Sequence, residues 1–181
     1  MEKAPRHPDK KVRVSTHKPV LEIALNDKRS KIHTVVEHGM GIASTPYFHS
    51  IPDVNMIISF EDDPNWMTCK NCLDGDSKSD HQIISFHDVD SLIGRINKPD
   101  QTLALIDGPH KQRIIMINTL QSIGVPYIVE HDSESLPVDE LNERLKLCKS
   151  NSYFVYQYVK LNPETMLYTR YDFNHPDLYR L

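Results

Sequence analysis

The chain has 181 residues, of which 39% are hydrophobic and 25% are charged, and its formal net charge is −4. This length suits one globular domain, and no apolar run approaches the ~18 residues of a membrane span. The N-terminus lacks the apolar stretch of a secretory signal, and three cysteines do not make a disulfide framework. We therefore expect a cytoplasmic protein without a membrane partner.

The charge is distributed unevenly along the chain. Residues 1–20 hold six Lys or Arg and two acids, so the remaining residues carry a net charge of −8. We expect residues 1–19 to form a basic, flexible tail and residues 20–181 to form a single domain. Residues 1–18 are a candidate contact for nucleic-acid phosphates, although the acidic body argues against a broad nucleic-acid surface.

Apolar periodicity and turn residues predict strands that alternate with helices. Strands are expected at residues 33–37, 54–61, 82–88, 102–107 and 125–132. Helices are expected at residues 20–30, from Ser44 onward, and at 65–72, 89–96, 111–123 and 137–150. Residues 152–159 and 165–172 flank "KLNPE" as a hairpin. This order predicts a mostly parallel sheet with helices on both faces.

An acidic residue stands at or near the end of every strand in the alternating region. These residues are Glu37, Glu61, Asp88, Asp107 and Asp132. Ligands of such sheets bind at the carboxyl ends of the strands, so this edge is where we expect the functional site.

The turn after the first strand, "EHGMGIAST", contains two of the six glycines in the chain. Gly39 and Gly41 lack a β-carbon, so the backbone can turn sharply and approach a ligand closely. Ser44 and Thr45 can cap the following helix and supply hydroxyl donors. A tight turn without a ligand explains this stretch equally well.

Glu61 lies 20 residues after Gly41, at the end of the second predicted strand, with Asp62 beside it. A carboxylate only accepts hydrogen bonds, so it suits the two hydroxyls of a ribose and repels a 2′-phosphate. The alternative is a surface acid at the start of a loop.

These motifs resemble those of class I S-adenosylmethionine-dependent methyltransferases. "VVEHGMG" resembles the first motif of that family, E-x-G-x-G-x-G, with Ala43 at the third glycine position. "IISFEDDPNW" resembles the second strand, "LALIDGPH" the fourth-strand motif, and the C-terminal hairpin its last two strands. The resemblance covers about residues 20–172. It implies a Rossmann-like α/β fold, with a mostly parallel seven-stranded sheet, helices on both faces and a C-terminal antiparallel β-hairpin.

The resemblance also implies S-adenosylmethionine as the cofactor. Glu37 would then orient the turn or meet the methionine amine, Glu61 would hold the ribose, and Asp88 would lie near the adenine amine. Asp107 would also border the cofactor. A dinucleotide is the competing ligand of such sheets, but its G-x-G-x-x-G motif is broken here by Ser44.

The candidates for the chemistry are Asp107, His110, His131 and Asp132, at the ends of the fourth and fifth strands. A histidine here can serve as a general base, because its pKa lies near neutrality. Alternatively, Asp107, His131 and Asp132 hold Mg²⁺, since catechol-type enzymes place metal ligands at these strand ends. Those enzymes carry Asp-Asn where this chain has His-Asp. A purely structural His131 is the third option.

The expected function is methyl transfer to a small-molecule acceptor, at oxygen or nitrogen. Three alternatives stay open: a nucleic-acid methyltransferase that uses the basic tail, an aminopropyl transferase, and a non-catalytic module that binds the cofactor. The D/N-P-P-Y/F motif of amino-methylating nucleic-acid enzymes is absent. Cys69 and Cys72 have no second C-x-x-C to complete a zinc site, and His81 and His87, the possible further ligands, are irregularly spaced.

Overall fold

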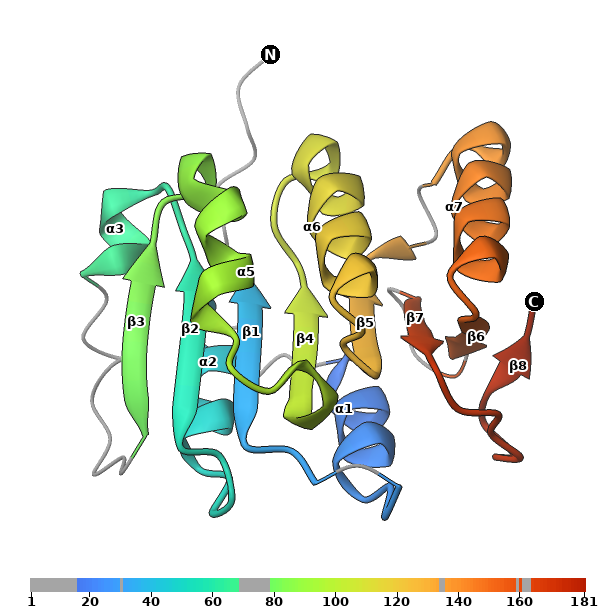
Figure 1. Ribbon diagram of the computed structural model, residues 1–181, viewed down its shortest axis with the longest axis horizontal. Coiled ribbons are helices and arrows are strands. Elements are labelled where there is room, and N and C mark those ends of the chain that lie inside the picture. The colour runs from blue at the N-terminus through green and yellow to red at the C-terminus, as the bar shows by residue number, and fades with distance from the viewer. Residues whose placement is uncertain (1–15, 30, 69–78, 134–135, 159, 161–163) are drawn as a thin grey trace, which may run out of the picture.

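The computed structural model describes residues 16–29, 31–68, 79–133, 136–158, 160 and 164–181. They form one eight-stranded sheet in the order β3-β2-β1-β4-β5-β7-β6-β8 (Figure 1). The strands are β1 Thr34–His38, β2 Met56–Phe60, β3 Asp80–Ile84, β4 Thr102–Ile106, β5 Tyr127–His131, β6 Phe154–Tyr158, β7 Thr165–Thr169 and β8 Tyr179–Arg180. Strands β1 to β5 are parallel, and β7, β6 and β8 continue the sheet with antiparallel pairing.

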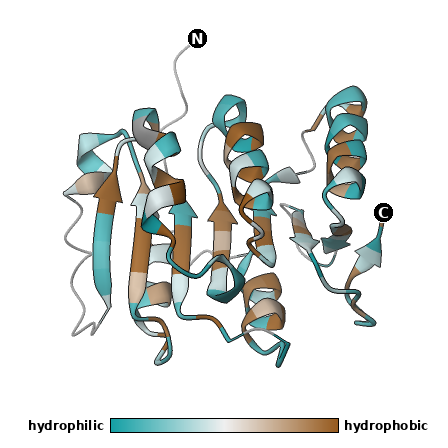
Figure 2. Cartoon of the chain, viewed as in Figure 1, coloured by the Kyte–Doolittle hydropathy of each residue, from teal (hydrophilic) through white to brown (hydrophobic). Residues whose placement is uncertain are grey.

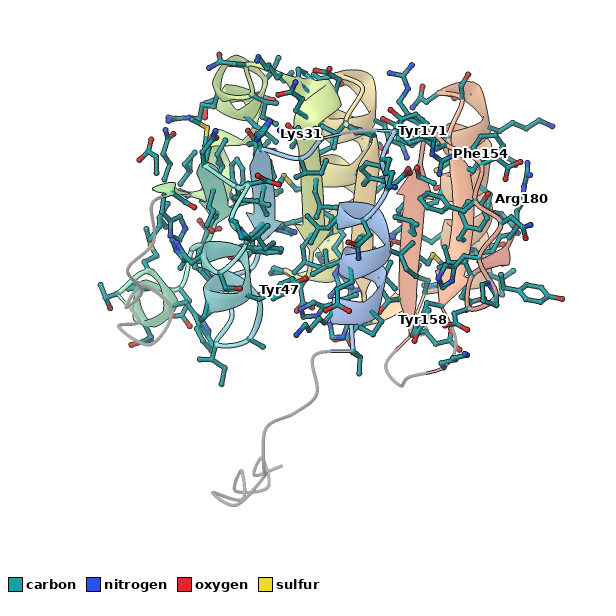
Figure 3. All side chains as sticks on the ribbon, turned by 90° about the horizontal axis from the view of Figure 1, so that it is seen from below. Lys31, Tyr47, Phe154, Tyr158, Tyr171 and Arg180 are labelled. Carbon is teal, nitrogen blue, oxygen red and sulfur yellow. The ribbon has the colours of Figure 1, made fainter. Side chains whose placement is uncertain are left out.

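Helices cover both faces of the sheet. The helical segments are α1 Lys18–Leu25, α2 Ser44–His49, α3 Pro64–Met67, η1 Phe86–Ser91, α5 Leu92–Arg95, η2 Pro99–Gln101, α6 His110–Ser122 and α7 Val138–Ser150. Figure 3 shows α1 and α2 on one side of the sheet and α5, α6 and α7 on the other. The predicted fold is therefore confirmed: a Rossmann-like sheet with a C-terminal antiparallel hairpin.

Alternation along each strand divides the core in two. Val36, Ile58 and Ala104 pack with α5, α6 and α7, whereas their neighbours Val35 and Ile57 pack with α1 and α2. Figure 2 shows this hydrophobic character along β2, β1 and β4, the inner strands. Because side chains alternate with a period of two, Glu37 faces α2 and His38 faces α6.

The third strand differs from its predicted bounds of 82–88. β3 ends at Ile84, and residues 86–91 form the 3₁₀ helix η1. Ser85 caps η1, and Asp62 Oδ1 accepts hydrogen bonds from the Ser85 hydroxyl at 2.7 Å and the Phe86 amide at 3.0 Å. These local bonds compete with the strand ladder. Asp88 therefore lies in η1 and does not end a strand.

Strand β8 adds one short edge strand to the seven that were expected. It pairs with β6, where Gln157 and Tyr156 face Tyr179 and Arg180. The Arg180 guanidinium lies 4.5 Å from the centre of the Phe154 ring, and Figure 3 shows both side chains at this end of the sheet.

The start of the domain contacts its last segment through Arg29. The Arg29 guanidinium lies 4.8 Å from the Tyr171 ring centre and 4.5 Å from that of Phe173, and it donates to the Asp172 carbonyl at 2.7 Å. Helix α1 starts at Lys18, inside the predicted tail, of which residues 1–15 are outside the described part. No helix among the described residues is long and apolar enough to cross a membrane.

Candidate functional site

The turn after β1 is held tightly against the turn after β4. Gly39 has a φ of +89°, and a β-carbon there would lie 2.9 Å from the Gly108 nitrogen and 3.0 Å from the Asp107 carbonyl carbon. Gly39 is therefore required by the protein's own backbone, because both its conformation and its surroundings exclude a side chain. At Gly41 a β-carbon would lie 3.1 Å from the Ser44 hydroxyl and 4.0 Å from the Ala43 nitrogen.

Glu37 is fully buried beneath this turn. Its Oε2 accepts hydrogen bonds from the Thr45 hydroxyl at 2.8 Å and the Ser59 hydroxyl at 3.1 Å, and Thr45 Oγ1 in turn accepts from the Gly41 amide at 3.2 Å. Burial raises the pKa of Glu37 to about 7, against the opposing effect of hydrogen bonds from Ser44, Thr45 and Ser59. Glu37 thus orients the turn, one of its two expected roles, and its contact with a cofactor amine stays a prediction.

Glu61 joins the turn to the end of β2. Its Oε2 accepts from the Met40 amide at 3.0 Å, and its Oε1 accepts from the amides of Asp62 and Asp63 at 2.9 and 2.8 Å. These bonds fix the carboxylate at the strand end, where a neighbouring hydroxyl can add to its remaining lone pairs. The hydrogen bonds from Ser85 and Phe86 hold the pKa of Asp62 below its ordinary value, so Asp62 stays ionised.

A cavity of about 290 Å³ opens between the carboxyl ends of β1, β2 and β4. Of the predicted cofactor residues, Gly39, Glu61, Asp62 and Asp107 line it. Glu37, Gly41, Ser44 and Thr45 form the turn next to the cavity without lining it. The side chain of Asp88 is outside the described part of the structure.

The cavity is also lined by several residues that the sequence analysis did not predict to be part of the site. They are His38, Met40, Phe60, Asp63, Phe86, Gly108, Pro109 and Gln112. Trp66 lines it as well. His38 is 1% exposed, and its Nε2 lies 3.1 Å from Gln112 Oε1. The alternation of side chains along β1 could have predicted the position of His38, because His38 projects from the face of the sheet opposite to Glu37.

His131 and Asp107 form a hydrogen-bonded pair at the adjoining ends of β5 and β4. His131 Nδ1 lies 3.0 Å from Asp107 Oδ1 and 3.4 Å from Asp132 Oδ1. Burial alone would lower the pKa of His131, but the hydrogen bond and the negative charge of Asp107, together with Asp132, raise it above its ordinary value. This is the geometry of a histidine that is oriented by a carboxylate.

The residues before α1 pack against the other side of this histidine. The Thr16 hydroxyl lies 2.5 Å from His131 Nε2, and the His17 ring meets the His131 ring edge-on, with centroids 4.9 Å apart. His17 is 5% exposed, and burial followed by the charge of His131 lowers its pKa to about 4. Both residues are separated from His131 by more than a hundred positions, so no local pattern predicts this contact.

The remaining predicted residues are placed differently. His110 begins α6 and is exposed, and it does not line the cavity. Asp132 has a φ of 55°, an uncommon conformation for a residue with a side chain. Among the described residues, the side chains that could share a metal ion are His17, Asp107 and His131, with ligand atoms within 4.8 Å of one another. Asp132 is not part of this set.

Arg113, on α6, binds the backbone at the carboxyl ends of β4 and β5. It is 3% exposed, its Nε donates to the Gly108 carbonyl at 2.8 Å, and its guanidinium also donates to the His131 carbonyl. Its nitrogens lie 4.0 Å from Asp107 Oδ1 and 3.9 Å from Glu130 Oε1. The buried charge is thereby balanced, and the two strand ends that carry the histidine pair are held in register.

No family model and no curated protein matches the sequence. Solved structures share its fold. The structure of precorrin 8W decarboxylase from Methanobacterium thermoautotrophicum matches with a TM-score of 0.58 at 13% identity, over 91% of this chain and 95% of that one. The methyltransferase domain of bacterial CtHen1 matches with a TM-score of 0.57 at 9% identity, over 85% of this chain and 97% of that one.

A third structure is the MycE methyltransferase of the mycinamycin pathway, in complex with Mg, SAH and mycinamycin VI. It matches with a TM-score of 0.51 at 14% identity, over 85% of this chain but only 45% of MycE. The chain therefore has the fold of the class I S-adenosylmethionine-dependent methyltransferases, as its motifs predicted. At these identities the likeness establishes the fold and leaves activity to be argued from the site.

Proposed function

We propose that this chain is an S-adenosylmethionine-dependent methyltransferase that acts on a small-molecule acceptor at oxygen or nitrogen. The observation that carries the proposal is the charge of the cavity. Four of the described lining residues are acidic, Glu61, Asp62, Asp63 and Asp107, and none is Lys or Arg. Such a cavity favours a cation like a sulfonium and repels the pyrophosphate of a dinucleotide.

The side chains present fit this cofactor. Glu61 accepts hydrogen bonds at the end of β2, where a ribose diol would lie, and Phe60, Trp66 and Phe86 offer flat apolar surfaces for a base. When bound, S-adenosylmethionine supplies an activated methyl group on a positively charged sulfur. The protein then has to align the acceptor, exclude water and remove a proton.

We assign the removal of the proton to His131. Asp107 holds its Nδ1, so Nε2 is the nitrogen left to take a proton, and the Thr16 hydroxyl beside it marks where an acceptor hydroxyl would have to lie. An acceptor hydroxyl or amine at that position would give its proton to Nε2, and Asp107 would stabilise the resulting imidazolium. We favour His131 over the exposed His110 because Asp107 orients the His131 ring at the ends of β4 and β5.

For a metal, the site offers two imidazoles and one carboxylate: His17, His131 and Asp107. Mg²⁺ prefers oxygen ligands, whereas mixed nitrogen and oxygen ligands suit Zn²⁺ or Mn²⁺. In this alternative we expect one of these two ions in place of Mg²⁺, and His131 would be a ligand of the metal and not the base.

A nucleic-acid acceptor is the second candidate. The six Lys or Arg of residues 1–20 favour it, because they can pair with phosphates. Binding through phosphates predicts an affinity for RNA that falls steeply with salt. Replacing Lys3, Arg6, Lys10, Lys11 and Arg13 with Gln should then abolish retention of RNA, and unchanged retention would leave only the small-molecule proposal.

Isothermal titration calorimetry with S-adenosylmethionine and S-adenosylhomocysteine tests the cofactor. We expect binding by the wild-type chain and binding weaker by about tenfold for Glu61→Gln, the loss of about one charged hydrogen bond. Glu143→Gln, an exposed change on α7, is the matched control and should bind as the wild type does. A folded wild-type chain that binds neither compound would overturn the proposal. Binding without any methyl transfer to candidate acceptors would indicate a non-catalytic module.

A further inference from the structure

A second cavity, of about 590 Å³, lies at the opposite edge of the sheet from the cavity of the candidate active site. Arg170, one of its lining residues, directly follows Thr169, and Thr169 pairs with Tyr127, the first residue of β5. The second cavity therefore lies where β5 begins, whereas the first cavity lies where the parallel strands end. A ligand of the second cavity would be separate from the cofactor.

The two cavities differ in the sign of their charge. The described lining residues of the second cavity include Lys149, Arg170 and Arg180 and contain no Asp or Glu. Those of the first cavity contain four acidic residues and no Lys or Arg. Because residues 21–181 carry a net charge of −8, this concentration of positive charge is local, and it would attract an anion to this edge of the sheet.

Lys149 and Arg170 carry the uncompensated charge of the second cavity. Among the residues that the structure describes, neither side chain forms an ion pair or a hydrogen bond. Arg180 differs, because its Nη1 donates to both carboxylate oxygens of Asp172 at 3.2 and 3.1 Å, and its guanidinium lies 4.5 Å from the centre of the Phe154 ring. Two cations that line one cavity thus keep all their donors for another partner.

The ends of α6 and α7 explain part of this placement. Lys149 lies in the last turn of α7, and Arg170 approaches Gly124, just beyond α6, where an added β-carbon would lie 3.3 Å from its Nη1. A positive charge is favourable near the C-terminus of a helix. This long-range attraction does not use the N–H groups of either side chain, so both can still donate to an anion.

Ser152 adds a hydroxyl to the same cavity from an unfavourable backbone conformation. It follows the C-terminal cap of α7 with a φ of 62°, and its amide and that of Tyr153 donate to the carbonyls of Lys149 and Cys148 at 3.3 and 2.8 Å. Glycine is the usual residue here, because a β-carbon is disfavoured at positive φ. The Ser152 hydroxyl makes no hydrogen bond to a described residue. Its presence is therefore better explained by a ligand than by stability.

We propose that the second cavity binds a small organic anion, whose carboxylate or phosphate group accepts hydrogen bonds from Lys149, Arg170 and Ser152. Leu145 and Val155 are among the apolar residues that line the cavity. A volume of about 590 Å³ lies within the usual range of small-molecule sites. An inorganic anion would leave the apolar lining without a contact, so the ligand carries an apolar part beside its acidic group.

Amide NMR of the full chain, with phenyl phosphate as the probe, tests this proposal. The amides of Ser152, Phe154 and Arg170 should shift and reach saturation, whereas those of Gly39 and Met40 in the first cavity should not shift. Phenol lacks the charge and inorganic phosphate lacks the ring, so each should bind about tenfold more weakly. Benzoate in the same titration shows whether the site prefers a carboxylate or a phosphate. Shifts confined to the first cavity, or phenol that binds as well as phenyl phosphate, would overturn the proposal.

Variants of the lining residues complete the test. Lys149→Gln and Arg170→Gln should each weaken the binding of phenyl phosphate by about tenfold, the loss of one charged hydrogen bond. Lys146→Gln is the matched control, because it removes the same charge from an exposed position of α7 that does not line the cavity. Ser152→Gly should raise the melting temperature by about 2–4 °C and still weaken binding, which separates the ligand contact from folding. Unchanged binding by the Lys149 and Arg170 variants, or an equal loss with Lys146→Gln, would refute the proposed site.

Discussion

The ring of His38 occupies the space into which a side chain at Gly108 would project. A β-carbon on Gly108 would lie 2.5 Å from Cε1, 2.6 Å from Nε2 and 2.8 Å from Nδ1 of that ring. Because the ring is buried and also packs on Phe86, with centroids 5.1 Å apart, it cannot move aside freely. The two turns that border the cavity therefore fit together through one histidine and one glycine.

Gly108→Ala should lower the free energy of unfolding by about 1–3 kcal/mol, the usual cost of overpacking. Urea denaturation of Gly108→Ala, His38→Ala and the double variant measures this loss of unfolding free energy. The double variant should lose less stability than the two single variants together, because His38→Ala opens the space that the new methyl group needs. Strictly additive losses would show that the two residues do not compete for that space.

Gly39→Ala should also destabilise the chain, by about 1–3 kcal/mol, because it combines a positive φ with a close approach to the backbone of the β4 turn. Gly94→Ala is the matched control. Gly94 lies in α5 with nothing within 4 Å of the added β-carbon, so alanine should stabilise there by about 0.5–1 kcal/mol. Thermal unfolding of both variants tests this difference. Equal changes in stability would contradict the interpretation of Gly39.

A third prediction of stability concerns the buried pair of Arg144 and Glu130. Both side chains are fully buried; Arg144 is also bonded to Glu140, and Glu130 accepts from the Tyr168 hydroxyl at 2.6 Å. Arg144→Met should cost about 3–5 kcal/mol, since it leaves a carboxylate buried without its main partner. Adding Glu130→Gln should recover part of this loss in chemical denaturation. A double variant that is less stable than Arg144→Met would refute this account.

The titration of Glu37 makes stability depend on pH. Its pKa is about 7 in the folded chain against an ordinary value of 4.5, so the folded state binds more protons between these two values. The contribution of Glu37 to stability therefore falls as the pH rises from about 4.5 to about 7. Glu37→Gln should remove this contribution. The difference in unfolding free energy between wild type and variant, measured across this range, should change steadily with pH, and a constant difference would contradict the raised pKa.

The sequence predicted the sheet well because its strands are short, apolar and rich in β-branched residues. β3 was placed too late because "IISFHD" continues the apolar pattern beyond Ile84, whereas the bonds from Ser85 and Phe86 to Asp62 start a 3₁₀ helix there. β8 was missed since its two residues are too few to show an alternating pattern.

The site was predictable only in part, because some of its contacts join residues that lie far apart in the sequence. Glu61 and Asp107 follow strands directly, so their position at the carboxyl edge was predictable from local patterns. The contact of Thr16 and His17 with His131 depends on how α1 packs beneath β5, which no local pattern encodes. The roles of Gly41, Ser44, Thr45 and Asp88 toward a cofactor stay predictions, as does the division into a tail and one domain.

Arg29 connects the C-terminal segment of the chain to the site, although that segment does not itself contact the site. Tyr171, Asp172 and Phe173 hold Arg29 at the end of the loop after α1, and the residues before α1 lie on His131. Cutting the chain after Thr169 would therefore remove these three partners of Arg29 and weaken the attachment of the segment that carries α1. A protease that trims the C-terminal segment would act on the histidine pair from the opposite end of the sequence, so C-terminal tags and truncations belong among the variables of any assay.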